Sequence, residues 1–323
     1  MRRRGRADPM AVARRVLAAA VALLALAAAG CARPAASSTD EAPPAAGRDL
    51  GAARVLRGEV YAQRDSGALQ LDLFLPKRRS GPVPLVVYAH GGGWDAGVRT
   101  LDADLSTTEA LTAERLLGHG YAVATVDYRL TGVAQAPAQV VDVADAVRWL
   151  QQRGGEWGVD GDRVVLWGAS AGGHLVSQLA AVAGDPGKPG GGLTGIRGVL
   201  NWFGPTDMSA EAQVSHPELR DYSQRSVRKL LGCVPLECPA TADASSPIKN
   251  VSGDEPPFLI QQGTSDSIVP IDQSLDFAAK LRGLGVAVDM HPYEGFDHGF
   301  GRGPRTPLIV DTAVAFVDTH LAR

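Results

Sequence analysis

The chain has 323 residues, of which 45% are hydrophobic, 21% charged and 6% aromatic, as is usual for a soluble globular protein. A chain of this size and composition can bury a large core without a structural metal or many disulfides. The formal net charge of −3 gives no electrostatic basis for binding nucleic acid, so we expect no nucleic-acid partner.

The first thirty residues differ from the rest of the chain. Six arginines precede an apolar run over 16–30 that consists almost entirely of Ala, Leu and Val. A basic segment followed by such a run is typical of an export signal. As a helix the run would be about 22 Å long, shorter than a hydrocarbon core of about 30 Å, which disfavours the alternative of a retained membrane anchor. We therefore predict an export signal over residues 1–30.

The apolar run ends in Gly30 and Cys31, a junction that resembles the lipobox of bacterial lipoproteins. The resemblance implies lipidation of Cys31 and a membrane tether in the cell envelope; a secreted protein is the alternative. Residues 31–54 hold Pro, Ala, Ser and charged residues with almost no large apolar side chain, which predicts a flexible linker. We expect the folded domain over 55–323.

Strand-like and helix-like segments alternate through this domain. β-rich or continuous apolar runs predict strands over 68–76, 83–91, 121–128, 163–168, 198–204, 257–263 and 286–293. Apolar spacing and turn signals predict helices over 111–118, 137–150, 271–283 and 307–321, and one that begins at Ser170. This alternation predicts an α/β fold, a doubly wound and mostly parallel sheet with helices on both faces. Residues 205–256 contain no strand-like run, so we predict that they form a small cap insertion over the strand ends.

Two cysteines lie within the cap insertion, Cys233 and Cys238. Their close spacing in a loop of an exported protein predicts a local disulfide. Metal ligation, the alternative, would need further His or Cys ligands nearby, so we predict no metal site.

Ser170 lies in the sequence Gly168-Ala169-Ser170-Ala171-Gly172, directly after a buried strand and at the start of a helix. A strand, G-x-S-x-G and a helix in this order are typical of a serine nucleophile held on a sharp turn. The backbone N–H of Ala171 would then point to where an oxyanion forms. In a protein with 38 glycines a bend without chemistry is the alternative, so the motif needs partners elsewhere in the chain.

A second motif, His90-Gly-Gly-Gly-Trp94, ends an earlier strand. Consecutive glycines let the backbone approach a substrate and present N–H groups without obstruction. We predict Gly92 and Gly93 as further oxyanion donors, with a flexible turn as the alternative.

A serine hydroxyl needs a base and an orienting acid to act as a nucleophile. His298 follows the last strand in a glycine-flanked loop, at the end of the sheet where Ser170 lies, and His291 within that strand is the competing base. Asp266 follows the strand over 257–263; Asp272 is better suited to starting the next helix. We predict that Ser170, Asp266 and His298 form the catalytic set, with no cofactor.

Several segments together resemble bacterial α/β-hydrolase esterases of the acetyl-xylan and feruloyl esterase branch, close to the hormone-sensitive-lipase-like carboxylesterases. They are YAHGGGW, VDYRL, PAQVVDVADAVRWL, DRVVLWGASAGGH, WFGPTDM, SPI, PPFLIQQGTSDSIVP and DHGF. The resemblance implies an α/β-hydrolase fold and an ester hydrolase with Ser170, Asp266 and His298 as its triad. Relatives often have His where this chain has Gln262, a difference we expect to affect packing more than catalysis.

The substrate class is less defined by the sequence. The function expected is a serine carboxylic-ester hydrolase acting on small-molecule esters, either short-chain or carbohydrate-linked. Pocket-lining roles are expected for aromatic residues near the strand ends, and core packing is the alternative for each: Trp94, Trp202 and Phe203, with Met208 and Tyr222 in the cap. The alternative functions are a serine peptidase or formamidase-type amide hydrolase, and a non-catalytic exported binding protein.

Overall fold

The computed structural model describes residues 49–77, 81–101, 107–209, 212, 220–301 and 303–322, without the side chains of residues 220–222. The predicted export signal, Cys31 and most of the predicted linker lie outside these residues. Within the described ranges, no helix is both long enough and apolar enough to cross a membrane.

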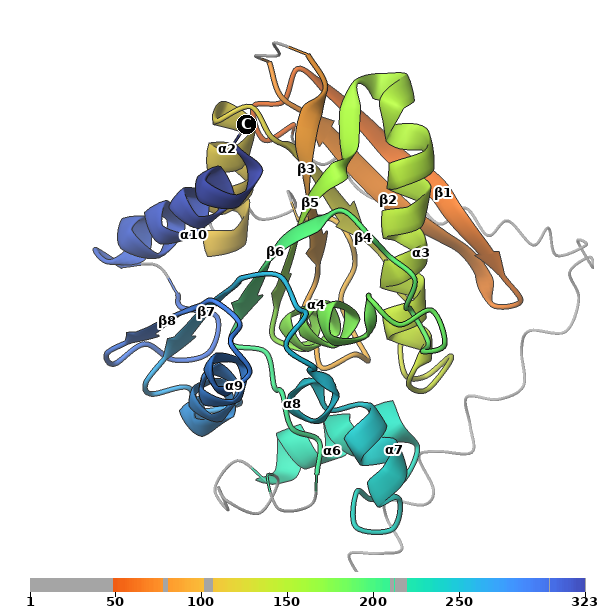
Figure 1. The fold of residues 1–323 in the computed structure, drawn as a ribbon, viewed down its shortest axis with the longest axis vertical. Coiled ribbons are helices and arrows are strands. Elements are labelled where there is room, and N and C mark those ends of the chain that lie inside the picture. The colour runs from red at the N-terminus through yellow and green to blue at the C-terminus, as the bar shows by residue number, and fades with distance from the viewer. Residues whose placement is uncertain are drawn as a thin grey trace, which may run out of the picture. The chain divides into compact units, whose positions relative to one another are not determined.

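Eight strands of the described chain form one sheet, in the order β1-β2-β4-β3-β5-β6-β7-β8 (Figure 1). The β1–β2 and β2–β4 pairs are antiparallel, and every other neighbouring pair is parallel. The strands are β1 (Arg54–Arg64), β2 (Gly67–Leu75), β3 (Val83–Ala89), β4 (Ala122–Val126), β5 (Val159–Ala169), β6 (Ile196–Trp202), β7 (Phe258–Gly263) and β8 (Val288–Tyr293). The predicted doubly wound, mostly parallel sheet is confirmed.

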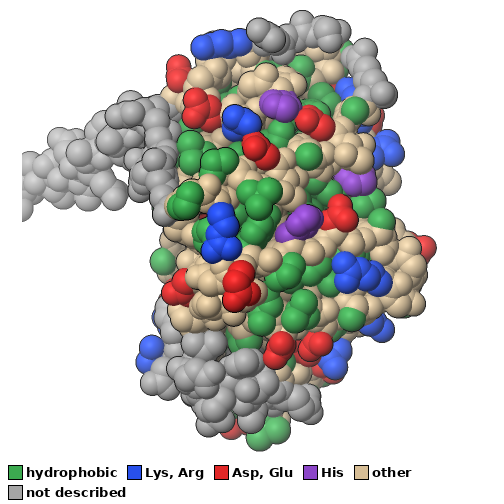
Figure 2. Space-filling model, turned by 90° about the vertical axis from the view of Figure 1, so that its left-hand side faces the viewer, with side chains coloured by type: hydrophobic (Ala, Val, Ile, Leu, Met, Phe, Trp, Pro, Cys, Tyr) green, Lys and Arg blue, Asp and Glu red, His purple; other side chains and the backbone are tan. Residues whose placement is uncertain are grey.

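Helices cover both faces of this sheet. The longer ones are α2 (Thr108–Gly118), α3 (Ala138–Arg153), α4 (Ala171–Val182), α9 (Ile271–Gly283) and α10 (Thr306–Leu321), and the 3-10 helix η1 (Gly154–Trp157) follows α3. Helices α2 and α10 pack on one face around one hydrophobic cluster, whereas α3, α4 and α9 contribute to a second cluster on the other face. On the face of α2 and α10, acidic and basic side chains are interspersed (Figure 2).

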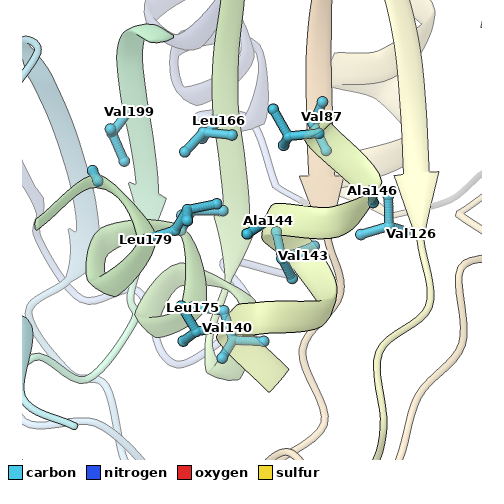
Figure 3. Close-up of a cluster of buried hydrophobic side chains, with 14 of the residues drawn as sticks. Val87, Val126, Val140, Val143, Ala144, Ala146, Leu166, Leu175, Leu179 and Val199 are labelled. Carbon is cyan, nitrogen blue, oxygen red and sulfur yellow. The ribbon is translucent and has the colours of Figure 1, made fainter. Parts of the chain in front are cut away.

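Burial on two faces explains why the central strands are continuously apolar. All five residues of β4 are buried, and so are all six of β7. Figure 3 shows part of the core between the sheet and helices α3 and α4, where Val87 of β3 and Leu166 of β5 lie next to side chains of both helices. Parallel strands covered by helices have no solvent-facing side, so they show no alternation of apolar and polar residues.

The start of the domain differs from our expectation in two respects. Strand β1 was not predicted, because its register shifts between Leu56 and Glu59 and again between Val60 and Ala62 disturb the alternation that marks a strand. In addition, Leu50 and Ala52, which we expected within the flexible linker, are buried in the cluster that contains α2 and α10. The packed chain therefore includes residues before 55.

Between β6 and β7 the described chain contains three helices, the last two of which are short. They are α6 (Arg220–Leu231), α7 (Pro239–Ala244) and α8 (Pro247–Asn250). Cys233 and Cys238 are joined by a disulfide in the loop between α6 and α7. Leu230 of α6 and Ala242 of α7 belong to the same buried cluster as α3 and α4, so this segment packs onto that side of the domain.

Candidate active site

Ser170 occupies a strained turn between β5 and α4. Its backbone angles, φ 54° and ψ −120°, lie in a region that a residue with a side chain rarely adopts, at a cost of about 1–3 kcal/mol. Two backbone hydrogen bonds hold this conformation: Ser170 N donates to Trp202 O at 2.8 Å, and His174 N donates to Ser170 O at 3.0 Å. The reversal of the chain leaves the half-buried side chain at the carboxyl end of β5.

The glycines on either side of Ser170 are required by close backbone packing. A Cβ atom on Gly168 would lie 2.3 Å from the carbonyl of Gly172, and one on Gly172 would lie 2.0 Å from the carbonyl oxygen of Ala89. Gly172 therefore brings the start of α4 directly against the end of β3. The G-x-S-x-G sequence is a packing requirement here and not a chance match in a glycine-rich chain.

The three residues predicted to act together form one hydrogen-bonded chain. His298 Nε2 lies 2.9 Å from Ser170 Oγ, and His298 Nδ1 lies 3.0 and 2.9 Å from the two carboxylate oxygens of Asp266. With its Nδ1 proton directed to Asp266, the imidazole presents a lone pair at Nε2 to the serine hydroxyl. This is the geometry in which a histidine can take the proton from a serine nucleophile.

Asp266 is held by four hydrogen-bond donors. Its side chain is fully buried, and its Oδ1 accepts the backbone N–H groups of Ile268 and Val269 at 2.9 and 2.8 Å. Gln262 Nε2 donates to the other oxygen, Oδ2, at 3.2 Å, and His298 completes the set. The carboxylate is thus fixed in orientation and has the hydrogen bonds that a buried charge needs.

Gln262 was expected to affect packing more than catalysis, and in the structure it contacts the carboxylate of Asp266. Its Nε2 also donates to Val269 O at 2.5 Å, and its Oε1 accepts the hydroxyl of Ser274 at 2.5 Å. These two contacts fix the amide, so that its N–H group faces Asp266. The link was not visible in the sequence because it depends on how the loop after β7 folds back on its own strand.

Asp297 and His291 have other roles than the acid and the base. Asp297 Oδ1 accepts the backbone N–H groups of Ser267 and His298, both at 2.7 Å, which ties together the loops that carry Asp266 and His298. These hydrogen bonds lower the pKa of Asp297. His291 lies in β8 opposite Gln261 and stacks on Tyr293.

The glycine motif after β3 packs against the turn at Ser170. A Cβ atom on Gly91 would lie 3.1 Å from Ala169 O and 3.3 Å from the Cβ of Ser170. The φ angles of Gly92 and Gly93 are 107° and 60°, and Gly92 O accepts the N–H groups of two later residues in this turn. Within the described ranges, the N–H groups of the three predicted oxyanion donors, Gly92, Gly93 and Ala171, donate no backbone hydrogen bond.

Two buried histidines support this motif from behind. His90 stacks on Tyr128 at 4.2 Å and its Nδ1 lies 2.7 Å from Gly91 O. His174 accepts the indole N–H of Trp94 at 3.2 Å through Nδ1, and its Nε2 lies 2.8 Å from Ser245 O. Burial lowers the pKa of both histidines, in His174 to about 4, so both are neutral at pH 7. The histidine at Ser170 Oγ is His298, so the contacts of His90 and His174 are structural.

The aromatic residues expected in the pocket are core residues. The exposed fractions are 3% for Trp94, 0% for Trp202 and 2% for Phe203, and Met208 is also fully buried. Trp202 donates its indole N–H to Gln261 Oε1 at 2.6 Å, and so faces the interior. For Trp94, Trp202 and Met208 this burial favours core packing, the alternative role. The side chain of Tyr222 lies outside the described part of the chain.

Phe203 nevertheless touches the site. Its ring centroid lies 4.7 Å from that of His298 and 4.9 Å from that of Phe300 in edge-on contacts. Phe203 and Phe300 have φ angles of 42° and 60°, unusual for residues with side chains. The aromatic edge supports the imidazole on one side, which helps to fix the ring in the plane of its contacts to Ser170 and Asp266.

Glu109, in the first turn of α2, was not considered in the sequence analysis. Burial raises the pKa of its carboxyl group, and the charge of a protonated His298 opposes this rise. An acidic residue at a helix start is common, so the sequence gave no reason to associate it with His298.

In the described ranges, no cluster of three or more His, Cys, Asp or Glu side chains is arranged to hold a metal ion.

Comparisons with known proteins agree with this architecture. The sequence profile of the BD-FAE family matches residues 71–281. Esterase LipC of Mycobacterium tuberculosis is 28% identical over 253 residues, which cover 76% of this chain and 59% of LipC. The next two curated relatives are covered to 46% and 48%, so this chain spans only about half the length of the curated relatives it matches.

Solved structures match over most of the domain. A truncated carbohydrate esterase from gut microbiota superposes with a TM-score of 0.71 at 23% identity, covering 84% of this chain and 99% of the other, which shows the fold alone. Esterase Est2 of Thermogutta terrifontis, solved with butyrate bound, has a TM-score of 0.66 at 26% identity and covers 84% of this chain and 96% of Est2. Another structure of that esterase is described as phosphonylated by sarin.

Proposed function

Because the chain belongs to the BD-FAE family of α/β-hydrolases, we propose that it is a serine carboxylic-ester hydrolase in which Ser170, His298 and Asp266 act as the catalytic triad. The observation that carries this proposal is the continuous hydrogen-bonded chain from Ser170 Oγ through the imidazole of His298 to the buried carboxylate of Asp266. In the described chain these three groups come from three separate strand ends.

In the proposed reaction, Ser170 Oγ attacks the carbonyl carbon of the ester while His298 Nε2 takes the hydroxyl proton. Asp266 stabilises the resulting imidazolium through Nδ1. The proton then passes from Nε2 to the leaving alcohol, and the acyl group stays on Ser170. Water, deprotonated by His298, attacks this acyl-enzyme and releases the acid, which restores the serine hydroxyl.

The negative oxygen of each tetrahedral intermediate is proposed to accept the N–H groups of Gly92, Gly93 and Ala171. The support is that these donors come from two chain segments packed against each other at Ser170, and that backbone donors need no reorganisation during the reaction. Removing a single donor of this kind typically lowers turnover by about 10²–10³-fold.

Short-chain esters are the proposed substrates. The butyrate bound to the related Thermogutta esterase supports a small acyl group. Carbohydrate-linked esters are the second candidate, on the basis of the family resemblance. Parallel assays with p-nitrophenyl acetate, butyrate and octanoate and with acetylated xylan would rank them, and we expect butyrate to be turned over faster than octanoate.

The decisive experiment for the triad is active-site labelling. We expect a fluorophosphonate probe to label the native protein and to leave the folded Ser170→Ala variant unlabelled, while p-nitrophenyl butyrate hydrolysis falls by about 10³-fold or more. Ser66→Ala, in the exposed turn between β1 and β2, is the matched control and should keep both signals. Equal labelling of Ser170→Ala and native protein would refute the assignment.

Labelling, together with a comparison of amide and ester substrates, separates the alternative functions. A peptidase or formamidase would label at Ser170 but hydrolyse an anilide or formamide faster than the matching ester. A non-catalytic binding protein would be folded and remain unlabelled.

We further propose that the protein is exported, with residues 1–30 as the signal and Cys31 as a lipidated tether. The support is the basic and apolar pattern of the N-terminal residues, together with the disulfide between Cys233 and Cys238, a bond that persists in oxidising compartments. Mass spectrometry of the N-terminal peptide from the native host should find a diacylglyceryl group on Cys31; an unmodified Met1 would contradict the proposal.

A further inference from the structure

His174 connects three segments of the chain that meet at the proposed active site. It lies in the first turn of α4, where its backbone N–H donates to Ser170 O at 3.0 Å. Its ring contacts the other two segments: Nδ1 lies 3.2 Å from the indole nitrogen of Trp94 in the glycine motif, and Nε2 lies 2.8 Å from Ser245 O in the cap. The serine turn, the glycine motif and the cap therefore converge on one buried side chain.

The two ring contacts define the orientation and the tautomer of this imidazole. An indole N–H only donates a hydrogen bond, and a carbonyl oxygen only accepts one. His174 therefore has its proton on Nε2, directed to Ser245 O, and presents the lone pair of Nδ1 to Trp94. Rotating the ring by 180° would place carbon atoms at both contacts and break both hydrogen bonds.

Trp94 is held in a backbone conformation that a residue with a side chain rarely adopts. Its φ angle is 61°, close to the 60° of Gly93, for which this value carries no steric cost. The Trp94 side chain is buried, and its carbonyl oxygen accepts the backbone N–H of Thr131 at 2.9 Å. In the described part of the chain, the N–H groups of Gly92 and Gly93 donate no backbone hydrogen bond. They are held through their neighbours, and Trp94 is the first anchored side chain after them.

We propose that His174 is a positioning residue for the reaction, whose structural contacts set the distance between Ser170 Oγ and the oxyanion donors Gly92 and Gly93. Its backbone N–H holds the serine turn and its ring holds Trp94, so one residue joins the two halves of the site. The contact of Nε2 with the cap fixes the ring from the other side. This role rests on the mechanism proposed above, in which the oxygen of the tetrahedral intermediate accepts those N–H groups.

A positioning role changes turnover more than substrate affinity. Oxyanion donors stabilise charge that develops only in the transition state, so displacing them lowers kcat and leaves KM nearly unchanged. Losing a whole donor lowers turnover by about 10²–10³-fold, and we expect a displaced donor to cost less, about tenfold. A side chain that only stabilised the fold would lower the Tm and leave the kcat of the folded protein as it is.

The test compares two variants of His174 that have nearly the same shape. Asn and Leu are close in size, but only Asn carries an oxygen near the position of Nδ1. With p-nitrophenyl butyrate we expect kcat to fall by about tenfold in His174→Leu and to stay within about threefold of native in His174→Asn, with KM within about twofold in both. Both variants lose the bond to Ser245 O, so that loss does not account for a difference between them. Native kcat in His174→Leu, or the same loss in the two variants, would overturn the proposal.

Trp94→Phe tests the other partner of the bond. It removes the indole N–H and keeps an aromatic ring, and we expect the same fall in kcat of about tenfold. Because both substitutions remove one contact, the double variant Trp94→Phe/His174→Leu should lose no more than either single variant; losses that multiply to about 100-fold would refute the coupling. Trp149→Phe is the matched control and should keep native kcat, since Trp149 stacks on Trp157 at the opposite end of β5 from Ser170.

Ser170→Ala separates this proposal from the mechanism on which it rests. If Ser170→Ala kept native hydrolysis, the triad and the role of His174 would both be wrong. If hydrolysis required Ser170 while His174→Leu and Trp94→Phe kept native kcat, only the role of His174 would be refuted. Should His174→Leu not fold, Trp94→Phe decides by the same criterion.

Discussion

A single methyl group added at Gly172 should separate the serine turn from the glycine motif. In Gly172→Ala the new Cβ would lie 2.0 Å from Ala89 O, 2.6 Å from Ala89 C and 2.7 Å from His90 O. Side-chain Cβ atoms essentially never come within 3.0 Å of such neighbours, so the closest distance must grow from 2.0 to at least 3.0 Å. Because all three neighbours are backbone atoms, no side-chain rotation can relieve the contact.

The displacement has two measurable consequences. Overpacking of a dense core typically costs about 1–3 kcal/mol, and we expect the upper end here because backbone must move. For a domain of this size that corresponds to a fall in Tm of roughly 6–12 °C. A misplacement of about 1 Å between nucleophile and oxyanion donors can lower turnover by about 100-fold, so kcat for p-nitrophenyl butyrate should fall by that factor.

Gly184→Ala is the matched control for this prediction. Gly184 lies just beyond α4, and an added Cβ would meet nothing within 4 Å. We expect its Tm within about 1 °C of native, since substitutions away from packed features change stability by less than about 0.5 kcal/mol. A Gly172→Ala variant with native Tm in scanning calorimetry and kcat within twofold of native would refute the packing argument.

Three further predictions concern stability. Burial lowers the pKa of His174 from 6.5 in the unfolded chain to about 4. Because the unfolded chain binds the proton more readily, the free energy of unfolding is highest above pH 6.5 and falls by about 3 kcal/mol as the pH drops towards 4. Urea unfolding between pH 4 and 8 should show a flatter profile for His174→Gln, and an unchanged slope would contradict the assignment. Replacing both Cys233 and Cys238 with Ser should cost about 2 kcal/mol, the chain-entropy value for so short a loop, and dithiothreitol should lower the Tm of native protein but not of this variant. The side chain of Asp142 is fully buried and paired with two arginines. Asp142→Ala should lower the free energy of unfolding by about 3–5 kcal/mol, because the arginines lose their buried partner. A change below 1 kcal/mol in denaturant titration would exclude this role.

The residues proposed as the triad could be selected from the sequence because each of them is marked by local signals. Ser170 lies between a continuous apolar strand and a helix, and Asp266 and His298 lie in the loops that follow β7 and β8. The carboxyl ends of parallel strands meet at one edge of the sheet, so the order of the elements is sufficient to predict that these residues lie together. The structure brings them within hydrogen-bond distance.

The sequence-based expectations were less accurate where the local sequence pattern does not reveal the direction of a side chain or the register of a strand. Trp202 is the last residue of β6 and Phe203 is the next; the indole of Trp202 packs in the core, whereas the ring of Phe203 contacts His298. Strand β1 contains register shifts that interrupt its alternation, so periodicity did not reveal it. Neither the direction of a side chain at the end of a strand nor the position of a bulge is encoded in the spacing of apolar residues.

The sequence by itself determined the alternation of strands and longer helices from β2 onward, the serine turn and the three residues proposed as the triad, because these depend on short-range backbone preferences and on the rules of parallel sheets. Only the tertiary structure decided that Gln262 holds Asp266 and that His174 supports Trp94. Each of these depends on side chains from segments that the chain brings together only on folding, where differences of a few tenths of an ångström decide whether a hydrogen bond forms.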